Sequence, residues 1–193
     1  MGKIYCLMGK SATGKDTIYK KLLVKAPNLK TITPYTTRPM RSGERNGVEY
    51  YFTDEAGLQQ LRDDGKVIEC RTYNTVFGPW HFFTVDDGQI ELANNDYLVI
   101  ITPEACVNFL NYFGEDNVVP LYITVPDGEL LLRALNRENA QENPHYDEMC
   151  RRFLADLNDF SEENLSKAHI EKRFINEDAD RTVDEIVTYI ESL

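Results

Sequence analysis

The sequence lacks the features of membrane-spanning, secreted and metal-clustering proteins. No segment approaches the roughly 18 uninterrupted apolar residues of a membrane-spanning helix, and the N-terminus carries no signal-peptide pattern. The four cysteines lie far apart, with no CxxC pair and no metal-ligand spacing, and are expected to be free thiols. We therefore expect a cytoplasmic protein with no membrane partner.

The sequence also lacks a net positive charge. Its 21 basic and 32 acidic residues give a net charge of −11, which argues against nucleic acid or an anionic membrane as a partner. The basic residues are unevenly spread, because residues 1–45 contain ten of them against two acidic residues, Asp16 and Glu44. An acidic protein with one strongly basic segment is expected to use that segment on a small anion.

Short apolar runs alternate with helical patterns along most of the chain. Ile4–Met8 is typical of a strand, and the run at 97–101 is typical of a strand buried on both faces of a parallel sheet. The same reading predicts helices at 104–113, 128–138 and 147–165, strands at 118–125 and 171–175, and a last helix opened by a capping box at 182–185. This alternation predicts an α/β fold with a doubly wound parallel sheet.

Residues 34–96 interrupt the alternation with shorter strands and a short helix near 54–63. We interpret them as a subdomain inserted into a single domain of residues 1–193, whose core is formed by 1–33 and 97–193. Residues 138–147 are polar and helix-breaking, which is typical of a mobile lid. No internal repeat or low-complexity tract is visible in the sequence.

A phosphate-loop pattern lies between the first predicted strand and the first predicted helix. It comprises Gly9, Lys10, Ser11, Ala12, Thr13, Gly14, Lys15, Asp16 and Thr17. In such loops the glycines let backbone N–H groups face the phosphates, and the following helix points its N-terminus at them. The lysine, here Lys15, reaches the outer phosphates. The pattern therefore predicts an ATP site.

Two residues of this loop are unusual. Asp16 stands where a Mg²⁺-binding serine or threonine is expected, and Ala12 replaces a glycine that is common in such loops. A carboxylate is a good ligand for a hard cation, but it places negative charge beside the triphosphate. Either Asp16, or Thr17 after a small shift, is predicted to bind Mg²⁺.

The segment 36–52 carries a second pattern, which reads TTRPMRSGERNGVEYYF. It resembles the acceptor-binding signature of guanylate kinases, which are P-loop nucleoside-monophosphate kinases. Two arginines three positions apart, on a loop rich in proline and glycine, form a fork for a phosphate. The resemblance implies that Arg38, Arg41 and Tyr50 hold the phosphate of GMP, and that Glu69 accepts hydrogen bonds from guanine.

The resemblance continues at lower specificity over most of the chain. It implies that Arg137 and Arg152, on either side of the predicted lid, neutralise charge on the transferred phosphoryl group. Lys15 completes this predicted catalytic set. Asn176 lies where the family's asparagine-bearing loop approaches the adenine of ATP.

The chain departs from the family in guanine recognition and in metal binding. Residues 99–102 read VIIT in place of the family's Leu-Asp-Ile-Asp, so two carboxylates are missing, and Pro34 replaces a serine. The family's Tyr-Gly-Ser segment aligns either with 77–79 or with 81–83, and both alignments lose a phosphate-binding tyrosine and a base-binding serine. Apart from that tyrosine, the residues that bind phosphate are therefore retained, whereas those that bind the base are reduced.

These observations predict a transferase of purine nucleotide metabolism that uses ATP and Mg²⁺ to phosphorylate a small anionic acceptor, with GMP preferred, as a monomer or homodimer. Two alternatives stay open. The loop ending Gly-Lys-Asp resembles that of ribose 1,5-bisphosphate phosphokinases, so the acceptor could be a phosphorylated sugar. The chain could also be a non-catalytic guanylate-kinase-like binding module, although such modules usually lose the phosphate loop.

Overall fold

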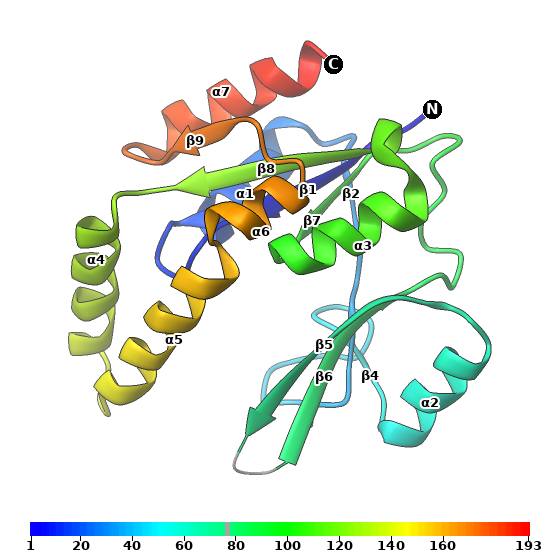
Figure 1. Ribbon diagram of the computed structural model, residues 1–193, viewed down its shortest axis with the longest axis horizontal. Helices are drawn as coiled ribbons and strands as arrows, with labels where there is room; N and C mark the ends of the chain where they lie inside the picture. The colour runs from blue at the N-terminus through cyan, green and yellow to red at the C-terminus, as the bar shows by residue number, and fades with distance from the viewer. Residues whose placement is uncertain (76–77) are drawn as a thin grey trace.

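A large parallel sheet forms the centre of the protein, as described by a computed structural model that covers residues 1–75 and 78–193 (Figure 1). Its five strands have the order β2-β7-β1-β8-β9, and every pair of neighbours is parallel. The strands are β1 Ile4–Met8, β2 Lys30–Thr31, β7 Tyr97–Ile100, β8 Val118–Thr124 and β9 Arg173–Ile175. The predicted parallel α/β fold is confirmed, and β2 is a strand that the apolar pattern does not reveal.

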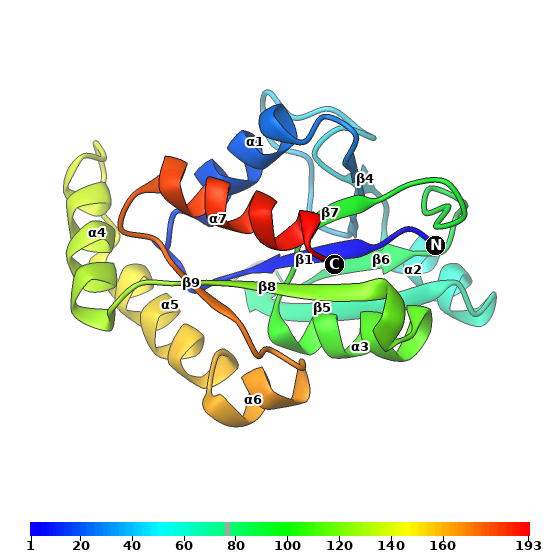
Figure 2. The same cartoon turned by 90° about the horizontal axis from the view of Figure 1, so that it is seen from above.

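Helices cover both faces of this sheet (Figure 2). On one face α1 (Lys15–Lys25) and α7 (Ala179–Glu191) pack on the strands, and on the other α3 (Pro103–Phe113) and α6 (Glu162–Lys167) do so. Alternate residues of the fully buried β1 enter the two cores, with Tyr5 and Leu7 on the α1–α7 side. This double burial explains why β1 reads as a continuous apolar run.

The segment between β2 and β7 forms a second, smaller sheet with the order β4-β3-β6-β5. Its strands are β3 Tyr35–Thr36, β4 Tyr51–Phe52, β5 Val67–Thr75 and β6 Gly78–Val85, and α2 (Glu55–Asp63) packs on it through Leu58. β5 and β6 form an antiparallel hairpin. Its strands and helix lie within the predicted insertion at 34–96, and the division of the chain into core and insertion stays an interpretation.

Two helices, α4 (Asp127–Asn139) and α5 (Tyr146–Asp159), form an arm at one end of the molecule (Figures 1 and 2). They are joined by residues 140–145. Glu138, near the end of α4, holds this connection, because its buried carboxylate accepts hydrogen bonds from the His145 backbone N–H (2.6 Å) and the Gln141 side chain (2.9 Å). The predicted lid at 138–147 contains this connection, and its mobility stays a prediction. Within the described residues, no helix combines the length and apolar character that a membrane span requires.

The helix predicted at 147–165 is wrong, because the structure has two helices there, α5 and α6. The chain bends at Phe160, whose buried ring stacks on Tyr122 of β8 with centroids 5.7 Å apart. Ser161 then takes an extended conformation before α6 begins.

Strand β8 contains a proline, Pro120, although proline cannot donate a backbone hydrogen bond within a sheet. β9 pairs with β8 only from Tyr122 onward, so the part of β8 that contains Pro120 is a sheet edge on that side and accommodates it.

The capping box predicted at 182–185 is also wrong, because α7 begins one turn earlier. Asp178 is its N-cap, and its carboxylate accepts a hydrogen bond from the backbone N–H of Arg181 at 2.9 Å. Thr182 lies inside the helix, and its hydroxyl donates to the Asp178 carbonyl at 2.8 Å. Both positions satisfy the local cap preference, and the structure uses the earlier one.

Replacement of Asp178 therefore tests where α7 starts. We expect Asp178→Ala to lower the free energy of unfolding by about 1 kcal/mol, because it removes the N-cap acceptor. Glu185→Ala, which would break the sequence-predicted capping box, should have an effect below about 0.5 kcal/mol. Urea denaturation of both variants gives the comparison. A larger loss in Glu185→Ala than in Asp178→Ala would contradict the observed helix start.

Candidate functional site

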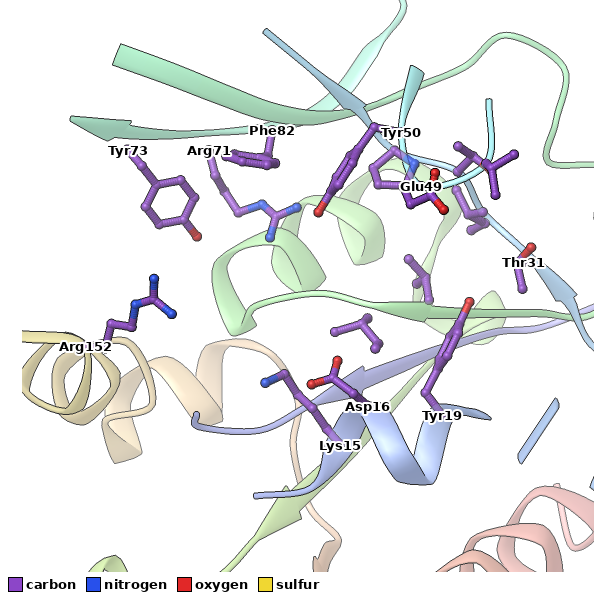
Figure 3. Close-up of a pocket in the computed structure, with 16 residues that line it drawn as sticks. Lys15, Asp16, Tyr19, Thr31, Glu49, Tyr50, Arg71, Tyr73, Phe82 and Arg152 are labelled. Carbon is purple, nitrogen blue, oxygen red and sulfur yellow. The ribbon is translucent and has the colours of Figure 1, made fainter. Parts of the chain in front are cut away.

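A pocket of about 780 Å³ lies between the large sheet and the small one. Its charged lining comes from four parts of the chain: Lys15 and Asp16 at the start of α1, Glu49 before β4, Arg71 on β5 and Arg152 on α5. The stick view shows these side chains converging from opposite sides (Figure 3). The pocket therefore joins the predicted phosphate loop to the predicted acceptor segment.

The phosphate loop is held by close backbone contacts. A Cβ on Gly9 would lie 2.8 Å from the Ile123 carbonyl oxygen and from the Thr13 hydroxyl, so no larger residue fits there without a shift. The Thr13 hydroxyl donates to the Lys10 carbonyl at 2.8 Å, and the Asn176 side-chain amide donates to the Thr13 carbonyl at 2.7 Å. These contacts fix the loop at the end of β1, where Lys15 follows.

Ala12 and Gly14 both have left-handed backbone conformations, with φ of +66° and +83°. Glycine adopts this conformation freely, whereas an alanine there is disfavoured by about 1 kcal/mol. Ala12 thus keeps the loop conformation that the more usual glycine would adopt. No side chain in the described part of the chain caps the N-terminus of α1, which leaves backbone N–H groups there for a ligand.

Of the two predicted metal ligands, Asp16 is the one that faces the pocket. Its carboxylate points into the cavity beside Lys15 (Figure 3), and the described lining residues do not include Thr17. The residues described contain no group of three or more His, Cys, Asp or Glu placed to hold a metal ion. One carboxylate next to a triphosphate is nevertheless a donor set that suits Mg²⁺, which commonly takes its other ligands from phosphates and water.

Helix α5 links the arm to the phosphate loop. Asp156 and Arg152 lie four residues apart and so share one helix face. The Asp156 carboxylate accepts a hydrogen bond from the Ser11 backbone N–H at 2.5 Å, while Arg152 extends into the pocket. Arg152 also pairs with Glu148 at 2.7 Å, and hydrogen bonds from Arg151 and Arg152 lower the pKa of Glu148 to about 2.

Arg137 lies apart from these groups. It is exposed in the last turn of α4, and the described lining residues do not include it. Asn176, the residue predicted near adenine, is buried and bound to the phosphate loop through its amide. The roles predicted for Arg137 and Asn176 stay predictions.

The acceptor segment is organised around a buried arginine. Arg38 is only 3% exposed and makes a bidentate pair with Glu44, with nitrogen–oxygen distances of 2.7 and 3.0 Å. Its guanidinium also lies over the rings of Tyr50 and Phe52, 5.5 and 5.6 Å from their centroids. Hydrogen bonds from Arg38 and from the Arg41 backbone lower the pKa of Glu44. Arg38 thus holds this loop together.

Of the three residues predicted to bind the acceptor's phosphate, Tyr50 lines the pocket and directs its hydroxyl into it (Figure 3). Arg41 is exposed, and the described lining residues include neither Arg38 nor Arg41. The phosphate-binding roles of these arginines stay predictions.

Glu69, the predicted guanine-binding carboxylate, already has partners within the protein. Its side chain is fully buried, with Arg71 Nε at 3.0 Å and the Thr84 hydroxyl at 2.9 Å. Arg71 was not predicted, yet it lines the pocket. Burial, the largest single effect, acts to lower the pKa of Arg71, but the electrostatic effects of Glu69, Tyr73 and Tyr50 and the hydrogen bond to Glu69 together outweigh it, so the pKa is raised. A sequence signal for the pair existed, because residues two apart on a strand share a face.

The wall beside these groups is apolar and aromatic. Pro34 and Ile100 line the pocket at positions where the sequence lacks the family's serine and aspartate. Val99 lines it beside Ile100, and Phe82 and Tyr73 line it from the small sheet. Of the two alignments of the Tyr-Gly-Ser segment, one includes Phe77, which lies outside the described residues. The other includes Phe82 together with His81, whose ring nitrogen lies 2.8 Å from the Thr72 hydroxyl.

Comparisons with known proteins agree with this architecture. The guanylate kinase family model matches residues 1–82, which contain the phosphate loop and the acceptor segment. The guanylate kinase of Chlorobaculum tepidum is 26% identical over 191 residues, covering 98% of this chain and 92% of the relative. That of Chlorobium chlorochromatii is 28% identical over 152 residues, 78% of each.

A mycobacterial relative shows where the similarity concentrates. The guanylate kinase of Mycobacterium bovis is 42% identical over 69 residues, which are 36% of this chain and 33% of the relative. Among solved structures, guanylate kinase from Anaplasma phagocytophilum shares the fold, with a TM-score of 0.69 and 23% identity over 99% of this chain and 85% of the other. The chain is therefore similar to guanylate kinases over almost its whole length, and its first 82 residues match the model of that family.

Proposed function

We propose that this protein is an ATP-dependent kinase of a nucleoside monophosphate, with GMP as the preferred acceptor. The observation that carries the proposal is the shared pocket, which Lys15 enters from the phosphate loop and Tyr50 enters from the acceptor segment. Transfer between two bound phosphates needs both to lie in one water-poor site, in line with each other. The similarity to guanylate kinases supports the proposed reaction class.

The donor half of the proposed site is the phosphate loop. The uncapped N-terminus of α1 would bind the β- and γ-phosphates through backbone N–H groups, and the Lys15 ammonium group would pair with the same phosphates. Asp16 would hold Mg²⁺, which when bound would supply positive charge that neutralises the phosphates. The Ser11 N–H now donates to Asp156, so a phosphate at that position would compete with this carboxylate.

The acceptor half is built on the small sheet. The Tyr50 hydroxyl would donate to the acceptor's phosphate, and Arg41 would reach it from the exposed loop. An oxygen of that phosphate would attack the γ-phosphorus of ATP, and the bond to the β-phosphate oxygen would break, which leaves ADP. Lys15 and Arg152 would stabilise the charge on the transferred group from two sides. Arg137 would join them only after movement of the arm.

A phosphorylated sugar is the second candidate acceptor. It is favoured by the engagement of Glu69 with Arg71 and Thr84, which occupies the carboxylate predicted to bind guanine. A binding module without catalysis is disfavoured, because the phosphate loop keeps its left-handed residues and its pocket-facing lysine. Turnover of ATP with a panel of nucleoside and sugar monophosphates separates the three functions, and no turnover with any acceptor would leave the binding module.

Replacement of Lys15 tests the donor site. We expect Lys15→Ala to lower kcat with GMP by at least about 100-fold, because it removes a charge that stabilises the transition state. The melting temperature without ligand should hardly change, since Lys15 faces the pocket rather than the core. Lys20→Ala, on an exposed position of the same helix, is the matched control and should be active. Near-normal turnover in Lys15→Ala would exclude the proposed donor site.

Replacement of the two arginines separates structure from binding. Arg41→Ala should raise KM for the acceptor about 10- to 100-fold, because it removes a charge-assisted contact with the acceptor's phosphate. KM for ATP and the melting temperature should stay unchanged. Arg38→Ala should lower the melting temperature, because it leaves the Glu44 carboxylate without its bidentate partner. Arg45→Ala, on the same exposed loop, is the control. Equal melting temperatures for the Arg38 and Arg41 variants would contradict the structural role given to Arg38.

A further inference from the structure

In the pocket between the two sheets, the sequence predicts that the carboxylate of Glu69 accepts hydrogen bonds from the base. The structure instead presents a hydrogen-bond donor there. The carboxylate of Glu69 is fully buried and accepts from Thr84 and from two nitrogens of Arg71, Nε at 3.0 Å and Nη2 at 3.3 Å. Its oxygens are therefore already satisfied by the protein. The group that reaches the cavity from this pair is the guanidinium of Arg71, whose side chain is 17% exposed (Figure 3).

The geometry of the pair leaves one edge of the guanidinium for a ligand. A guanidinium carries five N–H donors in a planar fork. Glu69 takes the side formed by Nε and Nη2. Among the residues that the structure describes, no hydrogen bond engages the end formed by Nη1 and the second Nη2 hydrogen, which can make a bidentate contact. That end suits two adjacent acceptor atoms in one plane.

The walls around this edge indicate which ligand provides those atoms. Tyr50, Tyr73 and Phe82 line the pocket close to Arg71, and Phe82 is its partner across the β5–β6 hairpin. Aromatic rings favour a planar, weakly hydrated group over a second phosphate. The O6 and N7 atoms of a 6-oxopurine are two adjacent in-plane acceptors, and arginine binds them in bidentate fashion in protein–DNA complexes.

We propose that Arg71 determines acceptor specificity, by donating from Nη1 and Nη2 to O6 and N7 of a 6-oxopurine while Glu69 fixes its orientation. The proposal rests on the proposed kinase function. It has two consequences for selectivity. The 2-amino group of guanine is not bound by Glu69, so IMP, which lacks that group, is accepted about as well as GMP. AMP is rejected, because its 6-amino group would place a donor against the donors of Arg71.

The unmodified protein provides the first test, through kcat/KM for GMP, IMP and AMP at saturating ATP and Mg²⁺. We expect GMP and IMP to agree within about tenfold, and AMP to be at least about 100-fold poorer, as expected for unpaired polar groups. A preference for GMP over IMP of 100-fold or more would overturn the role of Arg71 and leave the kinase function standing. Turnover of phosphorylated sugars alone would overturn it as well, and no turnover with any acceptor would overturn both proposals.

Substitution of Arg71 provides the second test. Arg71→Lys keeps a charge beside Glu69 but removes the fork, so kcat/KM for GMP and IMP should fall together and the GMP-to-AMP ratio should drop at least tenfold. Arg71→Ala frees Glu69 to accept from N1 and the 2-amino group, so the GMP-to-IMP ratio should rise. Arg62→Ala is the control, because Arg62 lies on helix α2, which packs on the same small sheet, and the described residues that line the pocket do not include it. KM for ATP should stay unchanged in all three variants.

Arg71→Ala leaves Glu69 buried with one partner fewer and can lower the stability of the protein. Arg71→Lys retains a cation beside Glu69, so its selectivity tests the proposal even if Arg71→Ala is unstable. Selectivity ratios compare substrates on the same enzyme sample, so a partly unfolded fraction cancels from them. An unchanged GMP-to-AMP ratio in Arg71→Lys would reduce Arg71 to a structural partner of Glu69 and overturn the proposal.

Discussion

The parallel arrangement of the large sheet is the constraint on which the site depends. Because all five strands run the same way, the loops that follow them meet at one edge, where ligands bind in open α/β sheets. β1 leads into the phosphate loop there, β7 ends in the pocket wall, and Asn176 follows β9 and binds that loop. The Asn176 backbone N–H also donates to the Thr124 carbonyl at the end of β8, at 2.9 Å. Lys15 is thus positioned by contacts among three strand ends.

Paired charges are the second theme of the structure. In a protein of net charge −11, three arginines in or near the pocket are each paired with a carboxylate: Arg71 with Glu69, Arg152 with Glu148 and Arg38 with Glu44. The pairs differ in burial. Glu69 is fully buried and holds its arginine firmly, whereas the Arg152 and Glu148 side chains are 58% and 39% exposed, and such exposed pairs contribute little to stability. The proposed exchange of this carboxylate for a phosphoryl group would therefore cost Arg152 little, whereas the orientation of Arg71 is already fixed by Glu69.

The sequence predicts the parts of the fold that have a local signal. The phosphate loop and the alternation of strands and helices follow from glycine spacing and apolar periodicity, and the parallel sheet follows from them. The two wrong element boundaries arise where local preferences compete: Asp178 and Thr182 are both suitable N-caps, and only packing selects between them. Phe160 breaks a helix because its ring stacks on Tyr122, a contact that no local pattern reveals. Asp156 was missed for the same reason, since its partner Ser11 is distant in sequence.

A crystal structure of the protein with GMP and a non-hydrolysable ATP analogue tests the central claim most directly, because it locates both ligands in the one pocket. The account predicts the triphosphate on the phosphate loop beside Lys15, and the purine with O6 and N7 within hydrogen-bonding distance of Nη1 and Nη2 of Arg71, with Glu69 still bound to Arg71. A purine bound through N1 and its 2-amino group to a Glu69 carboxylate that has released Arg71 would contradict it.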